Sequence, residues 1–165
     1  MLLIQVLRSA SCGQIVAVDL DESRLELARQ LGADHAFNPE TQEVVGEVLA
    51  LTARRGAGIA FEAVGVTRTV KTAIQCLRKG GTLVLVGNLA PTVEVPLQDV
   101  VTRELSLKGT YCSVGEYPAC LEMISRGVVD VAPMISAVAP LAEGAAWFDR
   151  LRSREPGLVK VVLLP

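Results

Sequence analysis

The sequence predicts an α/β protein built on a doubly wound, mostly parallel sheet. Segments with helical spacing of apolar residues alternate with short apolar runs as far as Gly87, a pattern typical of strands joined by crossover helices. Residues 15–18 and 83–86 are the continuous apolar runs expected of strands buried on both faces. Half of the residues are hydrophobic but only 4% are aromatic, so aliphatic side chains must build the core.

The first elements follow from apolar spacing and from helix-breaking residues. Apolar residues three and four positions apart predict a helix over residues 2–11, although Met1 to Leu7 could also form a strand. Asp21 or Glu22 begins the next helix, which ends at Gly32. The expected series is helix 2–11, strand 14–18, helix 21–31, strand 35–37, helix 40–54, strand 58–64, helix 67–77 and strand 82–87.

Beyond Pro91 the regular alternation changes. Here the apolar patterns predict helix 97–103, strand 105–111, helix 116–126, strand 135–138, helix 141–151 and strand 158–164. The doubly wound rhythm ends near residues 111–114, which is therefore the expected domain boundary.

Composition excludes several classes of protein. A net charge of −2 provides no basic surface for nucleic acid or an anionic membrane, and no apolar run approaches the roughly 20 residues that span a bilayer. The four cysteines have no CxxC spacing and His35 is the one histidine, which is a poor inventory for a metal site. We expect reduced thiols, a cytoplasmic location and a structural role for His35.

Asp19 stands at the end of the buried strand 14–18, and a helix opens directly behind it. In a doubly wound sheet, an acid at this point can accept both hydroxyl groups of an adenosine ribose, and its charge repels a 2′-phosphate. The alternative is that Asp19 only caps the following helix. Both interpretations fit the residues alone.

Five segments together resemble the zinc-dependent medium-chain alcohol and polyol dehydrogenases. The segments are IVAVDLDESRLELARQLGADHAFNP, IAFEAVG, CLRKGGTLVLVG, ELSLKGTYC and GLVKVVLLP, and their order and spacing are those of the family. The resemblance implies a Rossmann-type domain that binds NAD over residues 1–111. Residues 112–165 would form a C-terminal segment that returns toward a catalytic domain.

The resemblance also implies which residues contact the cofactor. Asp19 looks like the ribose acid, with Leu20 beside the adenine and Arg24 near the ribose. The remaining residues that it implies contact the cofactor are Ala63, Val64 and Gly65 after one strand, Val86 and Gly87 beside the nicotinamide carboxamide, and Lys160 toward the pyrophosphate. The alternatives are a solvated helix charge for Arg24, a core position for Val86 and an edge charge for Lys160.

The sequence departs from the family pattern at its start. It begins inside the helix that follows the family's first strand and GxGxxG turn, and it carries none of the family's zinc ligands. In the strand order 3-2-1-4-5-6, that first strand lies between strands 14–18 and 58–64. We therefore expect an N-terminally truncated fragment; otherwise a partner supplies the strand, or Met1 to Leu7 takes its place.

The resulting functional hypothesis is the NAD-binding portion of a zinc-dependent dehydrogenase. In the full-length enzyme, hydride would pass between a small alcohol and NAD, with zinc held in the absent catalytic domain. No catalytic residue is expected in this chain, which would be inactive alone. The alternatives are a zinc-free NADPH-dependent quinone or enoyl reductase, and a dimerisation module. In the family, the edge strand that here runs from Leu105 to Tyr111 pairs with its symmetry mate, so a homo-oligomer is expected.

Overall fold

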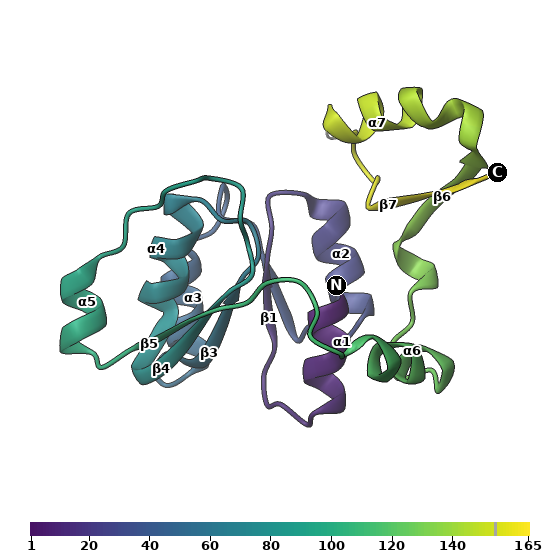
Figure 1. Cartoon of the computed structure of the whole chain (residues 1–165). Coiled ribbons are helices and arrows are strands. Elements are labelled where there is room, and N and C mark those ends of the chain that lie inside the picture. The colour runs from purple at the N-terminus through teal and green to yellow at the C-terminus, as the bar shows by residue number, and fades with distance from the viewer. Residues whose placement is uncertain (154) are drawn as a thin grey trace. The chain divides into compact units, whose positions relative to one another are not determined.

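The computed structural model describes residues 1–153 and 155–165 (Figure 1). The chain divides into two compact units. Unit 1 comprises Met1–Glu40 and Gly115–Pro165, and unit 2 comprises Thr41–Val114. No helix in the described residues is long and apolar enough to cross a lipid bilayer. The division expected from sequence, into residues 1–111 and 112–165, stays a prediction.

Unit 1 begins with helix α1 (Leu2–Ser9), strand β1 (Val16–Val18), helix α2 (Glu22–Gln30) and strand β2 (His35–Phe37). Strands β1 and β2 are parallel, with Val16 opposite His35 and Val18 opposite Phe37. Buried Ile4, Ile15 and Ala28 form a common core between the helices and β1. Because Leu2–Ser9 is helical, the first residues do not replace a strand of the sheet.

Arg8 joins α1 to the far end of α2 and to the start of β1. Its guanidinium donates to the Gly32 carbonyl at 3.1 and 2.5 Å and lies 2.8 Å from the Asp34 carboxylate. Asp34 also accepts the Ile15 N–H at 2.7 Å. This backbone hydrogen bond, together with the bond from Arg8, holds the pKa of Asp34 below its ordinary value.

The rest of unit 1 follows residue 115. It contains helix α6 (Tyr117–Ser125), the short 3₁₀ helices η1 (Ala132–Met134) and η2 (Leu141–Glu143), strand β6 (Ile135–Pro140), helix α7 (Gly144–Arg152) and strand β7 (Lys160–Leu164). Strands β6 and β7 pair in parallel. The side chain of Gln5, which is buried, donates to the Asp130 carbonyl at 2.9 Å and accepts the Asp130 N–H at 2.7 Å. This pair fastens the segment after α6 to α1.

Unit 2 is a three-stranded parallel sheet with helices. Its elements are helix α3 (Val44–Leu51), strand β3 (Ala57–Glu62), helix α4 (Thr67–Cys76), strand β4 (Leu77–Leu85), helix α5 (Leu97–Thr102) and strand β5 (Ser106–Gly109). The strand order is β3-β4-β5. The core centres on Val70, Ile74, Leu77 and Leu83, which are almost completely buried.

Most elements of unit 2 differ from their expected bounds by one or two residues, and the edge strand expected from Leu105 to Tyr111 covers only Ser106–Gly109. Two elements differ more. Helix α3 begins at Val44 rather than at residue 40, and the Glu43 carboxylate caps it by accepting the Gly46 N–H at 2.6 Å. Strand β4 begins at Leu77, directly after α4, because Leu77 already pairs with Ala57. The next pair is Ile59 with Thr82, so residues 78–81 bulge from the strand where a separate turn was expected.

Arg103 stabilises the junction between α4 and β4. Its guanidinium donates to the Ile74 carbonyl at 3.2 Å and to the Leu77 carbonyl. Its own carbonyl accepts the Gly80 N–H at 2.9 Å. A cation at a helix C-terminus satisfies carbonyls that lack a partner within the helix and also opposes the negative end of the helix dipole.

The pairings agree with the two halves of a doubly wound sheet. The pair β1-β2 corresponds to strands 2 and 3 of the order 3-2-1-4-5-6, and β3-β4-β5 corresponds to strands 4, 5 and 6. Among residues 1–153 and 155–165, β1 pairs only with β2 and β3 only with β4. The α/β fold class with parallel pairing predicted from sequence is confirmed.

Candidate functional site

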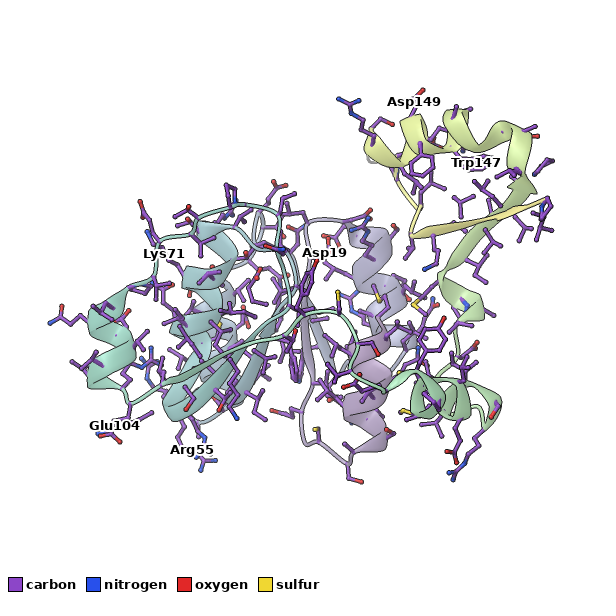
Figure 2. All side chains as sticks on the ribbon, viewed as in Figure 1. Asp19, Arg55, Lys71, Glu104, Trp147 and Asp149 are labelled. Carbon is purple, nitrogen blue, oxygen red and sulfur yellow. The ribbon has the colours of Figure 1, made fainter. Side chains whose placement is uncertain are left out.

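The first group of expected cofactor residues lies between β1 and α2 and in the first residues of α2, a segment that we call the Asp19 turn (residues 19–24). Asp19 follows the last residue of β1, and its side chain is 37% exposed (labelled in Figure 2). Its Oδ1 accepts the N–H of Asp21 at 3.1 Å. Asp21, and not Asp19, is the N-cap of α2 and accepts the N–H groups of Ser23 and Arg24. The capping alternative for Asp19 is therefore wrong.

Arg24 gives the Asp19 turn a mixed but predominantly negative character. Its Nη1 lies 3.9 Å from Asp19 Oδ2, and its Nε lies 3.8 Å from Asp21 Oδ2. At these distances the opposite charges attract each other but are too far apart for hydrogen bonds. Arg24 Nε is buried and has no hydrogen-bond partner in the described part of the chain. A hydrogen bond from the Ser23 hydroxyl, above all, lowers the pKa of Asp21 and keeps it ionised.

Asn38 holds the backbone of the Asp19 turn from the neighbouring strand. It lies just beyond β2, is buried, and donates from Nδ2 to the Leu20 carbonyl at 3.2 Å and to Glu22 Oε1 at 2.7 Å. Leu20 remains 50% exposed, as an apolar surface beside the acid. Asn38 was not among the residues expected from the sequence to contact the cofactor; the signal available for its role was an amide directly after the adjacent parallel strand.

The second group lies in unit 2, at the carboxyl ends of β3 and β4. Residues 63–65 and 86–90 form two loops joined by backbone hydrogen bonds, which we call the paired loops. Leu89 N–H donates to the Val64 carbonyl at 3.2 Å and Ala90 N–H donates to the Gly65 carbonyl at 2.9 Å. Ala63 thus belongs to the same loop as Val64 and Gly65, opposite Val86 and Gly87.

Two glycines allow the paired loops to approach each other. Gly65 has a φ of +85°, and a Cβ there would lie 2.5 Å from the Asn88 nitrogen. A Cβ on Gly87 would lie 2.2 Å from the Gly65 nitrogen. Both values are far below an ordinary contact of about 3.5–4.0 Å, so these positions require glycine.

The valines of the paired loops are not core residues. Val64 is 47% exposed and lies two residues after the end of β3, and Val86 is 42% exposed and directly follows β4. The core alternative for Val86 is therefore wrong. Exposed apolar side chains beside backbone held by glycines are a suitable surface for a flat, partly apolar ligand.

Lys160 stands apart from both groups in the sheet topology. It opens β7 and pairs with Ile135 in the β6–β7 sheet, which is separate from the sheets that contain β1 and β3. No ion pair between residues that the structure describes includes Lys160. The expected pyrophosphate contact stays a prediction.

Potential metal ligands do not gather in the described residues. No group of three or more His, Cys, Asp or Glu side chains there could hold a metal ion. The His35 ring stacks on Phe37 with centroids 6.1 Å apart. The four cysteines are free, and burial raises the pKa of the Cys76 thiol to about 11.

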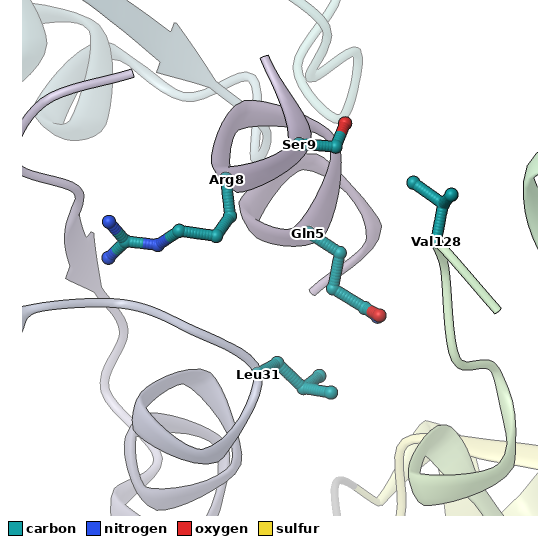
Figure 3. A pocket seen from close by; sticks show the side chains of 5 residues that line it. All are labelled: Gln5, Arg8, Ser9, Leu31 and Val128. Carbon is teal, nitrogen blue, oxygen red and sulfur yellow. The ribbon is translucent and has the colours of Figure 1, made fainter. Parts of the chain in front are cut away.

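A hollow of about 300 Å³ in unit 1 is lined by Gln5, Arg8, Ser9, Leu31 and Val128 (Figure 3). Its polar side chains already form hydrogen bonds with other residues of unit 1. Gln5 binds Asp130, Arg8 binds Gly32 and Asp34, and the Ser9 hydroxyl donates to the Val6 carbonyl at 2.8 Å. The hollow contains none of the expected cofactor residues.

Comparison with known proteins identifies the family of this chain. A family model described as zinc-binding dehydrogenase matches residues 1–126. A sorbitol dehydrogenase of Arabidopsis thaliana is 36% identical over 133 residues, which are 78% of this chain and 36% of that protein. The crystal structure of 2R,3R-butanediol dehydrogenase from Bacillus subtilis matches with a TM-score of 0.89 and 28% identity, over 99% of this chain and 47% of that one.

A zinc-binding dehydrogenase of Sinorhizobium meliloti, solved bound to NADP, matches with a TM-score of 0.87 and 25% identity. That match covers 98% of this chain and 48% of that chain. This chain thus spans less than half the length of each of these three proteins. Because the family model matches more than half of this sequence, the chain belongs to the zinc-binding dehydrogenase family.

Proposed function

We propose that this chain is the NAD-binding portion of a zinc-dependent alcohol or polyol dehydrogenase. The observation that carries the proposal is the Asp19 turn. The Asp19 carboxylate, directly after β1, does not cap the next helix and remains accessible beside an exposed leucine. An acid in this place can accept the two hydroxyl groups of an adenosine ribose. Sorbitol and butanediol dehydrogenases among the relatives support a small alcohol as the substrate.

The described residues fit a nicotinamide dinucleotide in two places. Asp19, Leu20 and Arg24 would hold the adenosine. The paired loops, which Gly65 and Gly87 allow to approach each other and which expose Val64 and Val86, would lie against the nicotinamide. The bound dinucleotide accepts or donates the hydride. The residues of this chain bind and orient it; we assign them no proton transfer.

The same residues do not fit a catalytic zinc. With no three metal-ligating side chains gathered in residues 1–153 and 155–165, we derive no step through a metal here. We propose that the zinc ligands belong to the portion of the relatives that this chain does not span.

Charge supports NAD over NADP. A 2′-phosphate would meet the carboxylates of Asp19 and Asp21, and Arg24 is already placed between them. The fold alone does not decide, since the Sinorhizobium meliloti relative is bound to NADP. The acids also make the NADPH-dependent quinone or enoyl reductase alternative unfavourable.

Calorimetric titration of the 165-residue chain with NADH and with NADPH tests the proposal. We expect the wild-type chain to bind NADH more tightly than NADPH. Asp19→Ala should lower the affinity for NADH by roughly 10- to 150-fold, which corresponds to the loss of about 1.5–3 kcal/mol of hydrogen bonding to a charged acceptor. Asp149→Ala, another acid of unit 1, is the matched control and should change nothing. A folded chain that binds neither nucleotide, or an Asp19→Ala variant that binds NADH normally, would contradict the proposal.

We also propose that the chain associates with a second copy through strand β5. Within the described residues β5 pairs only with β4, and Tyr111 beyond it is 81% exposed. A strand edge with unpaired backbone groups can pair with the same edge of another copy. Size-exclusion chromatography with and without NADH distinguishes a dimer that depends on the cofactor from a dimerisation module indifferent to it.

The four free cysteines support a cytoplasmic location.

A further inference from the structure

Glu62 is a buried carboxylate at the end of a strand that is otherwise apolar. It is the last residue of β3, and only 3% of it is exposed. A buried acid needs hydrogen-bond donors that satisfy its oxygens. The donors here identify what the side chain does.

Among residues 1–153 and 155–165, all of the donors to the Glu62 carboxylate come from the loop and helix directly after β3. Oε1 accepts the N–H of Val64 at 2.9 Å, the N–H of Gly65 at 2.9 Å and the Thr69 hydroxyl at 2.7 Å. Oε2 accepts the Gly65 N–H at 3.0 Å. The carboxylate therefore fixes the course of residues 63–65 and links that loop to the first turn of α4.

The backbone carbonyl of Glu62 holds the other loop. It accepts the N–H of Val86 at 2.8 Å and the N–H of Gly87 at 2.9 Å, directly after β4. A single residue thus contacts both paired loops, one through its side chain and the other through its main chain. The close approach of Gly65 and Gly87 leaves little room for either loop to move without the other.

We infer that Glu62 is a positioning residue for the nicotinamide end of the dinucleotide: its carboxylate sets the shape of loop 63–65, and its carbonyl seats residues 86 and 87 against that loop. The inference rests on the proposed function for its ligand. Glu62 is buried behind the loops, so it acts through them and not by contact with the nucleotide.

Binding of NADH and of ADP-ribose to Glu62→Gln tests this role, because ADP-ribose contains the adenosine and both phosphates but no nicotinamide. The glutamine amide would turn an NH₂ group or a weaker acceptor toward the loop N–H groups. We expect NADH affinity to fall about tenfold or more and ADP-ribose affinity to change less than about twofold. Glu47→Gln, an exposed acid of the same unit, is the matched control.

If Glu62 had only a structural role, Glu62→Gln would weaken the binding of NADH and of ADP-ribose equally, or would change neither. Either result would overturn the inference. Thr69→Val supplies a second variant in case Glu62→Gln does not fold, since it removes one donor to Oε1 and leaves the carboxylate in place. We expect Thr69→Val to lower the affinity for NADH severalfold and to leave the affinity for ADP-ribose unchanged. Equal binding of NADH to Thr69→Val and to wild type would count against the positioning role of Glu62.

Amide hydrogen exchange separates this inference from the proposed function. In Glu62→Gln, the N–H groups of Gly65, Gly87 and Ala90 should exchange at least about tenfold faster, while those of β5 keep their protection. If the wild-type chain binds no nucleotide, the proposed function fails and exchange still decides whether Glu62 holds both loops. Unchanged protection of Gly87 and Ala90 would show that it does not.

Discussion

Replacement of Gly87 by alanine tests how tightly the paired loops are built. The new Cβ would lie 2.2 Å from the Gly65 nitrogen and 2.3 Å from the backbone carbon and nitrogen of Val64. All three are main-chain atoms, which cannot turn aside as a flexible side chain can. One loop must therefore move by about 1 Å or more to reach a contact of about 3.4 Å or longer.

Such a movement breaks the hydrogen bonds between the loops. Those at risk are Gly87 N–H to the Glu62 carbonyl, Leu89 N–H to the Val64 carbonyl and Ala90 N–H to the Gly65 carbonyl. With about 1 kcal/mol for each bond, Gly87→Ala should lower the free energy of unfolding by roughly 3 kcal/mol. This is a large share of the roughly 5–15 kcal/mol that stabilises an ordinary domain.

Urea denaturation followed by circular dichroism measures this loss. Gly109→Ala is the matched control, because Gly109 lies in β5 of the same unit and its Cβ would meet nothing within 4 Å. We expect the control to stay within about 0.5 kcal/mol of wild type. A Gly87→Ala variant as stable as the control would refute the reasoning, since the paired loops would then accommodate a methyl group without loss of their hydrogen bonds.

Three further predictions concern other contacts. Arg103→Ala should lower the free energy of unfolding by about 1–3 kcal/mol in urea denaturation, because the end of α4 loses its donor; Arg103→Lys should restore only part of it. The pKa of Asp34 is lowered in the fold, so its stabilisation is present above the ordinary carboxyl pKa and is lost as pH falls through the lowered pKa; wild type and Asp34→Asn should therefore converge in acid and differ at neutral pH. A thiol reagent at pH 8 should modify exposed Cys112 and Cys120 quickly and buried Cys76, with its pKa of about 11, only on unfolding.

Apolar spacing was sufficient to predict most of the fold. Each helix and strand expected from the sequence is present, because amphipathic helices and buried strands differ in period and glycine or proline separates many of them. The start of β4 was misplaced because its first pair, Leu77 with Ala57, is set by a neighbouring strand and by Arg103 at the end of α4. Such contacts leave no local trace in the sequence.

The candidate site shows the same limit. Asp19 was identifiable because an acid directly after an apolar strand is a local pattern. Glu62 and Asn38 were not, since their importance comes from the atoms they meet on other segments: Val86 and Gly87 in the first case and Leu20 in the second. Their residue types alone do not reveal these contacts.

The hydrogen bonds between Gln5 and Asp130 have a consequence for the order of folding. They join residues 125 positions apart, so unit 1 is discontinuous in sequence, whereas unit 2 is the uninterrupted stretch Thr41–Val114. During synthesis, all of unit 2 leaves the ribosome before Asp130 does. Its parallel sheet can therefore form early, while closure of unit 1 must await the last third of the chain and carries the entropic cost of a long loop.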